Sequence, residues 1–136
     1  MPVIEGSQRL KTAIAEYDFA VDGGAVSTIT LRTASGDSLG NSLPTGSVIH
    51  SGYIEVDTIL ASGGAATVSV GSEAAGDLLG ATAFGSSPWS STGRKSITPA
   101  ATGATSVKTT AARSISIAVA TAALTGGKFR VVVFYK

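Results

Sequence analysis

The fold class follows from one stretch of the chain, Val48-Ile49-His50-Ser51-Gly52-Tyr53-Ile54-Glu55-Val56-Asp57-Thr58-Ile59-Leu60. Along it, Tyr53, Glu55 and Asp57 alternate with Ile54, Val56 and Thr58. An alternation with a period of two residues is typical of a strand that buries one face and exposes the other. The stretch therefore predicts a half-buried β-strand.

The same alternation recurs on both sides of this stretch, at residues 27–31, 66–70 and 114–119, each bounded by Gly or by Ser/Thr clusters. At the C-terminus it places Phe129, Val131, Val133 and Tyr135 on one face, directly after the pair Gly126-Gly127. A glycine pair before an alternating run indicates a turn that leads into a strand. We expect the C-terminal segment to be a central strand.

Two segments have an ambiguous pattern. Between Gln8 and Val21, apolar residues fit helical spacing as well as one face of a strand, and the Tyr and Phe content with the Asp22-Gly23-Gly24 turn favours a strand from about Ala13. Residues 72–79 are compatible with a short helix, which Gly76 would weaken. Neither ambiguity changes the fold class.

Short strands with turn signals about every ten residues, and no long amphipathic helix, are typical of sandwiches and jelly rolls. The prediction is an all-β protein with a single antiparallel β-sandwich or jelly-roll-like domain over residues 11–136 and an N-terminal arm over residues 1–10. The stretch from Gly85 to Thr105 is rich in Ser, Thr, Gly and Pro and is long for a connection. Long loops of this kind are usually functional or disordered.

The composition excludes several classes of function. The 10 basic and 9 acidic residues give a formal net charge of +1, so the chain lacks the one-sided field of a dedicated nucleic-acid or anionic-membrane binder. It has no cysteine, which removes disulfides and Cys-based metal sites. The N-terminus lacks the pattern of a signal peptide, and no apolar run approaches the roughly 18 residues of a membrane span. The sequence predicts a soluble protein with an unusually uncharged surface, of which part is covered by a partner.

Catalytic residues are scarce. His50 is the only side chain that titrates near neutral pH, and it lies inside a predicted strand without a recognisable nucleophile motif. Asp18, Asp22 and Asp37 lie near predicted turns, but their spacing matches no calcium-loop pattern. We therefore expect no enzyme, no metal site and no cofactor.

The glycine pairs carry no phosphate-binding signature. Gly23-Gly24, Gly63-Gly64 and Gly126-Gly127 are not followed by Lys-Ser/Thr, and no convincing helix follows them. We interpret all three pairs as turns.

The candidate interface lies in the long loop. Phe84, Pro88 and Trp89 are suited to an apolar anchor at a protein interface, because Trp is enriched among residues that carry binding energy. Arg94 and Lys95 beside Trp89 form the best basic-plus-aromatic cluster for nucleic acid, because an aromatic ring can stack on bases while Arg and Lys neutralise phosphate. The alternative for Trp89 is burial in the protein's own core, with Arg94 and Lys95 on an ordinary solvated loop.

Four stretches carry a family resemblance: YDFAVDGGAV at 17–26, GSVI at 46–49, AATVSVG at 65–71 and LTGGKFRVVVFY at 124–135. Together they resemble small structural proteins of tailed bacteriophages that are encoded among the head genes. The resemblance implies a capsid decoration or cement protein: a β-sandwich subunit, commonly trimeric, that lies on the outer capsid surface of the virion and bridges neighbouring major capsid proteins.

The low charge and the lack of catalytic residues agree with a capsid-stabilising role, which needs area and shape. The alternative is a carbohydrate- or host-surface-binding β module of the virion, in a head fibre or tail, with Trp89 and Tyr53 as its aromatic platform. Both functions predict a virion protein whose partners are not nucleic acid or membrane. The first also predicts a homo-oligomer, with a trimer favoured.

Overall fold

The alternation seen in the sequence becomes two long, paired strands at the centre of the molecule. In the computed structural model, which describes residues 10–33, 40–99 and 106–136, these are β5 (Ile49–Ser62) and β11 (Leu124–Tyr135). Along β11, Phe129, Val131 and Val133 are completely buried, as the period of two predicts. β11 also pairs with β1 (Lys11–Asp18), so it is a central strand, as expected.

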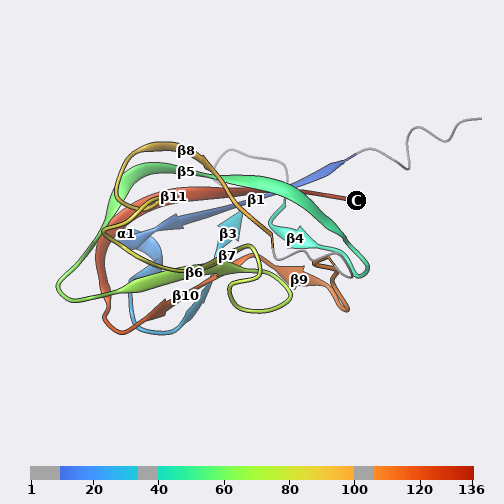
Figure 1. Cartoon of the computed structure of the whole chain (residues 1–136). Helices are drawn as coiled ribbons and strands as arrows, with labels where there is room; N and C mark the ends of the chain where they lie inside the picture. Colours follow the sequence, from blue (N-terminus) through green and yellow to red (C-terminus); the bar gives the residue numbers. More distant parts are fainter. Residues whose placement is uncertain (1–9, 34–39, 100–105) are drawn as a thin grey trace, which may run out of the picture.

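The strands form two main antiparallel sheets that face each other (Figure 1). A five-stranded sheet has the order β3-β1-β11-β5-β8, where β3 is Arg32–Thr33 and β8 is Gly93–Ser96. A four-stranded sheet has the order β2-β10-β6-β7, built from β2 (Thr28–Thr30), β10 (Ser116–Ala120), β6 (Thr67–Gly71) and β7 (Leu79–Ala83). A small third sheet pairs β4 (Ser42–Leu43) with β9 (Arg113–Ser114). The protein is an all-β antiparallel sandwich, which confirms the predicted fold class.

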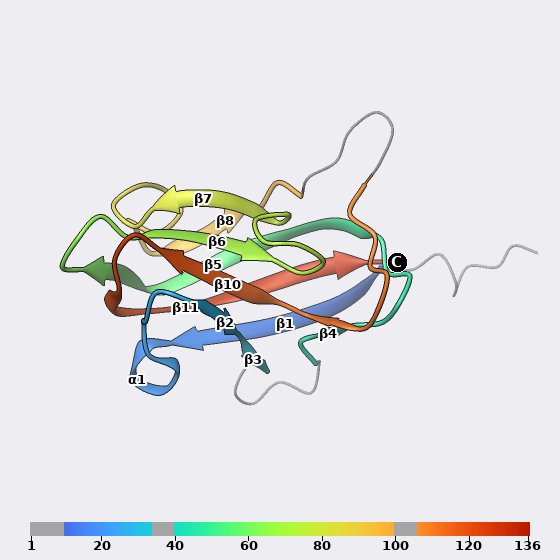
Figure 2. The same cartoon turned by 90° about the horizontal axis from the view of Figure 1, so that it is seen from below.

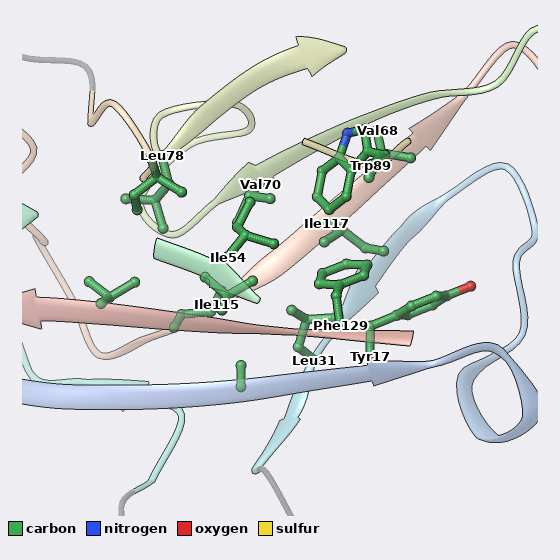
Figure 3. Close-up of a cluster of buried hydrophobic side chains, with 14 of the residues drawn as sticks. Tyr17, Leu31, Ile54, Val68, Val70, Leu78, Trp89, Ile115, Ile117 and Phe129 are labelled. Carbon is green, nitrogen blue, oxygen red and sulfur yellow. The ribbon is translucent and has the colours of Figure 1, made fainter. Parts of the chain in front are cut away.

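Aromatic rings fill the space between the sheets (Figure 3). The ring of Phe129 lies 5.1 Å from that of Tyr17 and 4.8 Å from that of Trp89, measured between centroids. Ile54 and Val70 extend the core between the sheets. Rings at these separations interact favourably beyond their buried area.

One lateral side of the sandwich is closed by the chain itself. Between β2 and β3 the backbone passes from the four-stranded to the five-stranded sheet at Leu31, which is buried and donates its N–H to the carbonyl of Ile115 at 3.0 Å. The opposite side is formed by two edge strands, β7 and β8, and the connection between them contributes the buried Trp89 (Figure 2).

The structure corrects the prediction for Gly126-Gly127. These residues lie inside β11, at register shifts against β5, and not in a turn. Gly127 has φ +135°, and a Cβ there would lie 2.2 Å from Cδ2 of Leu60. A glycine pair that marks a β-bulge has the same sequence signature as one that marks a turn.

The predicted strand around Ala13 ends earlier than expected. Residues 19–22 form α1 (Phe19–Asp22), a single helical turn, because the Asp18 side chain caps it by accepting the N–H of Ala20 at 3.0 Å. Residues 72–79 contain no helix before β7 begins at Leu79; there Asp77 accepts the N–H groups of Ser72, Glu73 and Ala74 and holds a tight turn.

The expected long loop from Gly85 to Thr105 contains the edge strand β8, which pairs with β5 through Tyr53↔Ser96 and Glu55↔Arg94. Its last part, residues 100–105, lies outside the described residues, as do Asp37 and residues 1–9 of the predicted N-terminal arm.

Candidate interaction surface

The five residues of the predicted interface divide into a buried and an exposed group. Pro88 and Trp89 are buried, and Phe84 is half-buried against the core. The Trp89 backbone carbonyl also accepts the N–H of Leu60 at 3.3 Å, which fixes the turn to β5. The structure thus places Trp89 in the protein's own core, the alternative that the sequence left open, and its indole is not available to stack on a base.

Lys95 and Arg94 lie on β8 but serve different contacts. Lys95 Nζ donates to the carbonyl of Thr92 at 2.9 Å and also to that of Ser91, so it holds the turn before β8. The Arg94 guanidinium lies over the ring of Tyr53, with Cζ 4.2 Å from the ring centroid, and donates from Nη2 to Glu55 at 3.3 Å. The Arg94 side chain remains 62 % exposed. Arg94 therefore places a largely exposed charge at this edge of the sheet.

Arg94 is the last member of a row of charges that crosses the whole five-stranded sheet. Strand register places one charged residue of each strand side by side, in the order Arg32, Glu16, Arg130, Glu55, Arg94. The signs alternate strictly, from plus at one edge to plus at the other. We call these five residues the charge row.

One member of the charge row, Glu16, is buried. The Glu16 side chain is only 5 % exposed, and its carboxylate lies 3.9 Å from Arg32 Nη1 and 4.0 Å from Lys128 Nζ. Arg32 also pairs with Asp22 at 2.8 Å, and this hydrogen bond is the main cause that raises the pKa of the Arg32 guanidinium. Opposite charges on neighbouring strands stabilise the sheet and at the same time define a charge pattern on its outer surface.

A second row of the same face is apolar. Ile14, Val132 and Tyr53 are aligned across β1, β11 and β5, and the Phe134 ring lies 6.1 Å from that of Tyr53. Interfaces are enriched in aromatic residues and Arg. The outer face of the five-stranded sheet, defined by the charge row and these four residues, is therefore the candidate interaction surface.

The residues that the sequence offered as catalytic or metal-binding candidates make local structural contacts. His50 is exposed, and its Nδ1 lies 3.1 Å from Ser51 Oγ. Asp18 and Asp22 serve the cap of α1 and the ion pair with Arg32. Within residues 10–33, 40–99 and 106–136 there is no group of three possible metal ligands and no pocket. None of the helices in these ranges is long and apolar enough to cross a membrane.

An open aromatic platform formed by Trp89 and Tyr53 is not present among the described residues. Trp89 is completely buried, and Arg94 covers one face of the Tyr53 ring. Sugar binding on aromatic platforms needs a free ring face. The arrangement gives the carbohydrate-binding alternative no specific support.

The comparisons with known proteins show what shares this fold. No protein-family model matches the chain, and neither does any curated protein. Three solved structures do match. A chain of the capsid of Ralstonia phage GP4 is 20 % identical with a TM-score of 0.61, over 99 % of this chain and 88 % of that chain.

The other two structures give the same result. A chain of the Cyanophage Pam1 capsid asymmetric unit is 18 % identical with a TM-score of 0.59, over 99 % of this chain and 98 % of that chain. A chain of the acidic stable capsid structure of Helicobacter pylori bacteriophage KHP30 is also 18 % identical with a TM-score of 0.59, over 94 % of this chain and 87 % of that chain. At these identities the likeness establishes the fold.

Proposed function

We propose that the protein is a structural component of a phage virion, which binds the outer surface of the capsid and stabilises it by bridging major capsid subunits. The observation that carries the proposal is the shared fold with chains from three phage capsid structures, each matched over nearly the whole of this chain. We further propose that it acts as a homo-oligomer, most simply a trimer.

A physical argument supports the role of a protein that bridges capsid subunits. A protein that binds the assembled lattice but not separated subunits stabilises the lattice by its binding free energy. Such a protein needs a rigid scaffold and a shaped surface. The sandwich supplies the scaffold, because its strands are paired across five- and four-stranded sheets around a core of packed aromatic rings.

The outer face of the five-stranded sheet is the surface that we assign to the capsid. It combines Tyr53, Phe134 and the exposed Arg94 with the alternating signs of the charge row. Alternating charges select a partner with the complementary order and reject one with like charges opposite. The other predicted residues, Phe84, Pro88 and Trp89, belong to the core side of the molecule and not to this face.

The test is binding to heads assembled without this protein, measured by co-sedimentation, followed by the temperature at which the heads release their DNA. We expect the purified protein to sediment with heads and to raise the release temperature. Arg94→Glu is expected to weaken binding at least tenfold, because it places a carboxylate next to Glu55 in the charge row. Lys11→Glu makes the same change of charge at an exposed position that shares the inward-facing register of β1, opposite Tyr135, and is expected to bind normally.

Two outcomes would contradict the proposal. Failure of the folded wild-type protein to sediment with heads would exclude the capsid role. If Arg94→Glu and Lys11→Glu bound equally well, the capsid role would stand, but the outer face of the five-stranded sheet would not be the contact.

A further inference from the structure

Exposed aliphatic side chains gather at one end of the sandwich. Of the four large hydrophobic residues that are exposed in the described part of the chain, three lie there: Val21 in α1 at 65 %, Val26 before β2 at 55 % and Ile59 in β5 at 47 %. Val21 and Val26 belong to residues 19–27, and Ile59 belongs to residues 57–66. Together with residues 120–127, these segments lie at the end opposite the C-terminus (Figures 1 and 2). We call these three segments the α1 end.

The three segments are held together around the beginning of β11. Leu124 donates its N–H to the carbonyl of Gly24 at 2.8 Å, which joins the first segment to the third. Ser62 Oγ donates to the carbonyl of Ala123 at 2.7 Å, which joins the second to the third. The exposed aliphatic residues therefore stand on a fixed framework.

Val21, Val26 and Ile59 do not pack in the core of this chain. α1 contributes no buried residue, and Val21 is its most exposed large side chain. Contiguous exposed apolar surface on a soluble protein marks an interaction site. Single exposed aliphatic residues are common on protein surfaces, but three at one end of a sandwich indicate a surface that a partner covers.

The α1 end is also almost free of charge. Its three segments contain two ionisable residues, Asp22 and Asp57. Asp22 is neutralised by Arg32 at 2.8 Å, which leaves Asp57 as the one carboxylate there with no ion pair among the described residues. Depletion of charge is what distinguishes the centre of a protein–protein interface from the remaining surface.

We infer that the occupant of the α1 end is a second copy of the same chain. Two such ends bring together nearly neutral, apolar surfaces, so their contact meets little electrostatic opposition. The outer face of the five-stranded sheet behaves differently. The charge row reads plus, minus, plus, minus, plus from either edge of the sheet. If two copies stacked face to face with their rows aligned, each charge would therefore lie opposite a like charge.

The two surfaces therefore have separate partners. Identical copies that meet at one end around a rotation axis form a closed assembly and leave their sheet faces free. The inference rests on the proposed homo-oligomer and is independent of the proposed binding to a capsid. Isolated protein is therefore sufficient for the test.

The test measures the mass of the purified protein by light scattering over a dilution series. We expect a mass that is a multiple of the 13.5 kDa chain. Val21→Glu and Val26→Glu are expected to reduce it to that of one chain while each variant stays folded by circular dichroism, because both residues are exposed. Leu10→Glu is the matched control: it changes an aliphatic residue that is 42 % exposed at the other end of β1, and it should leave the mass unchanged.

A second measurement uses the absence of cysteine from the sequence. Val26→Cys introduces one thiol, and mild oxidation is expected to give covalent dimers in high yield, whereas Leu10→Cys is expected to give few. A wild-type protein that stays monomeric at every concentration would overturn the inference, although binding to heads could still hold. An oligomer that survives both glutamate variants, or that Leu10→Glu also dissociates, would overturn it as well.

Discussion

Tyr17 is a buried residue whose hydroxyl still has a polar partner. The hydroxyl donates to the carbonyl of Gly23 at 2.6 Å, while the ring stacks on Phe129. Burial, helped by the carboxylates of Asp22 and Asp18, raises the pKa of Tyr17 to about 12. The folded protein thus favours the neutral phenol.

This shift has a testable consequence at high pH. The folded-state pKa is above the unfolded value, so the contribution to stability is complete below about pH 10 and is lost as the pH rises through about 12. Tyr17→Phe cannot ionise. We expect it to be less stable than the wild type by about 1 kcal/mol at pH 7, for the lost hydrogen bond, and the gap to narrow above pH 10. Thermal melts of both proteins across this range measure the gap, and parallel curves would refute the assignment.

Single residues also show where prediction from sequence stops. Trp89 lies in a segment rich in Ser and Gly, which is the composition of a surface loop, so its complete burial depends on the β7–β8 connection folding back over the core. Within the described residues its Nε1 has no hydrogen-bond partner. No local pattern distinguishes such a core residue from an interface anchor.

At the scale of elements, the bulge in β11 offers the sharpest test. Gly127 has φ +135° and lies against Leu60, whereas at the adjacent Gly126 a Cβ would meet only Ala61 at an ordinary 3.7 Å. Gly127→Ala is expected to destabilise the fold by about 1–3 kcal/mol, because it adds backbone strain and crowds Leu60. Gly126→Ala is the matched control and is expected to cost less than about 1 kcal/mol.

Urea unfolding measures both free energies. Equal losses in the two variants would mean that the bulge at Gly127 imposes no special backbone conformation. A larger loss at Gly126 would point to a different register between β5 and β11.

The long strands were predictable because apolar and polar residues alternate along them, and this alternation follows the alternation of buried and exposed side chains. β5 and β11 each bury every second side chain over much of their length, and the sequence shows this directly. β8 is four residues long, and none of its residues is buried, so no apolar period identifies it. Asp18 ended the first strand early through a side-chain cap that competes with strand propensity.

The whole molecule brings together what the sequence separates. The charge row joins five residues that are spread from Glu16 to Arg130, and only the sheet order makes them neighbours. The residue types were visible in the sequence, but the order β3-β1-β11-β5-β8 was not. The candidate surface therefore became visible only in three dimensions.

The near balance of charge predicts how a partner would be bound. With a formal net charge of +1, the chain has little long-range field, and alternating signs cancel within a short distance. We expect the affinity for heads to change less than about tenfold when salt rises from about 0.05 to 0.5 M. Co-sedimentation across that range gives the slope, and a steep loss of binding would show that a one-sided charge dominates the contact.

The strand pairing Lys11↔Tyr135 sets the first residue of β1 beside the last residue of β11, far from the α1 end. A peptide fused genetically after Lys136 would therefore emerge away from Val21, Val26 and Ile59. The scaffold is thus suited to carrying an added epitope or enzyme without obstructing that end, and short linkers at this position should leave self-association intact.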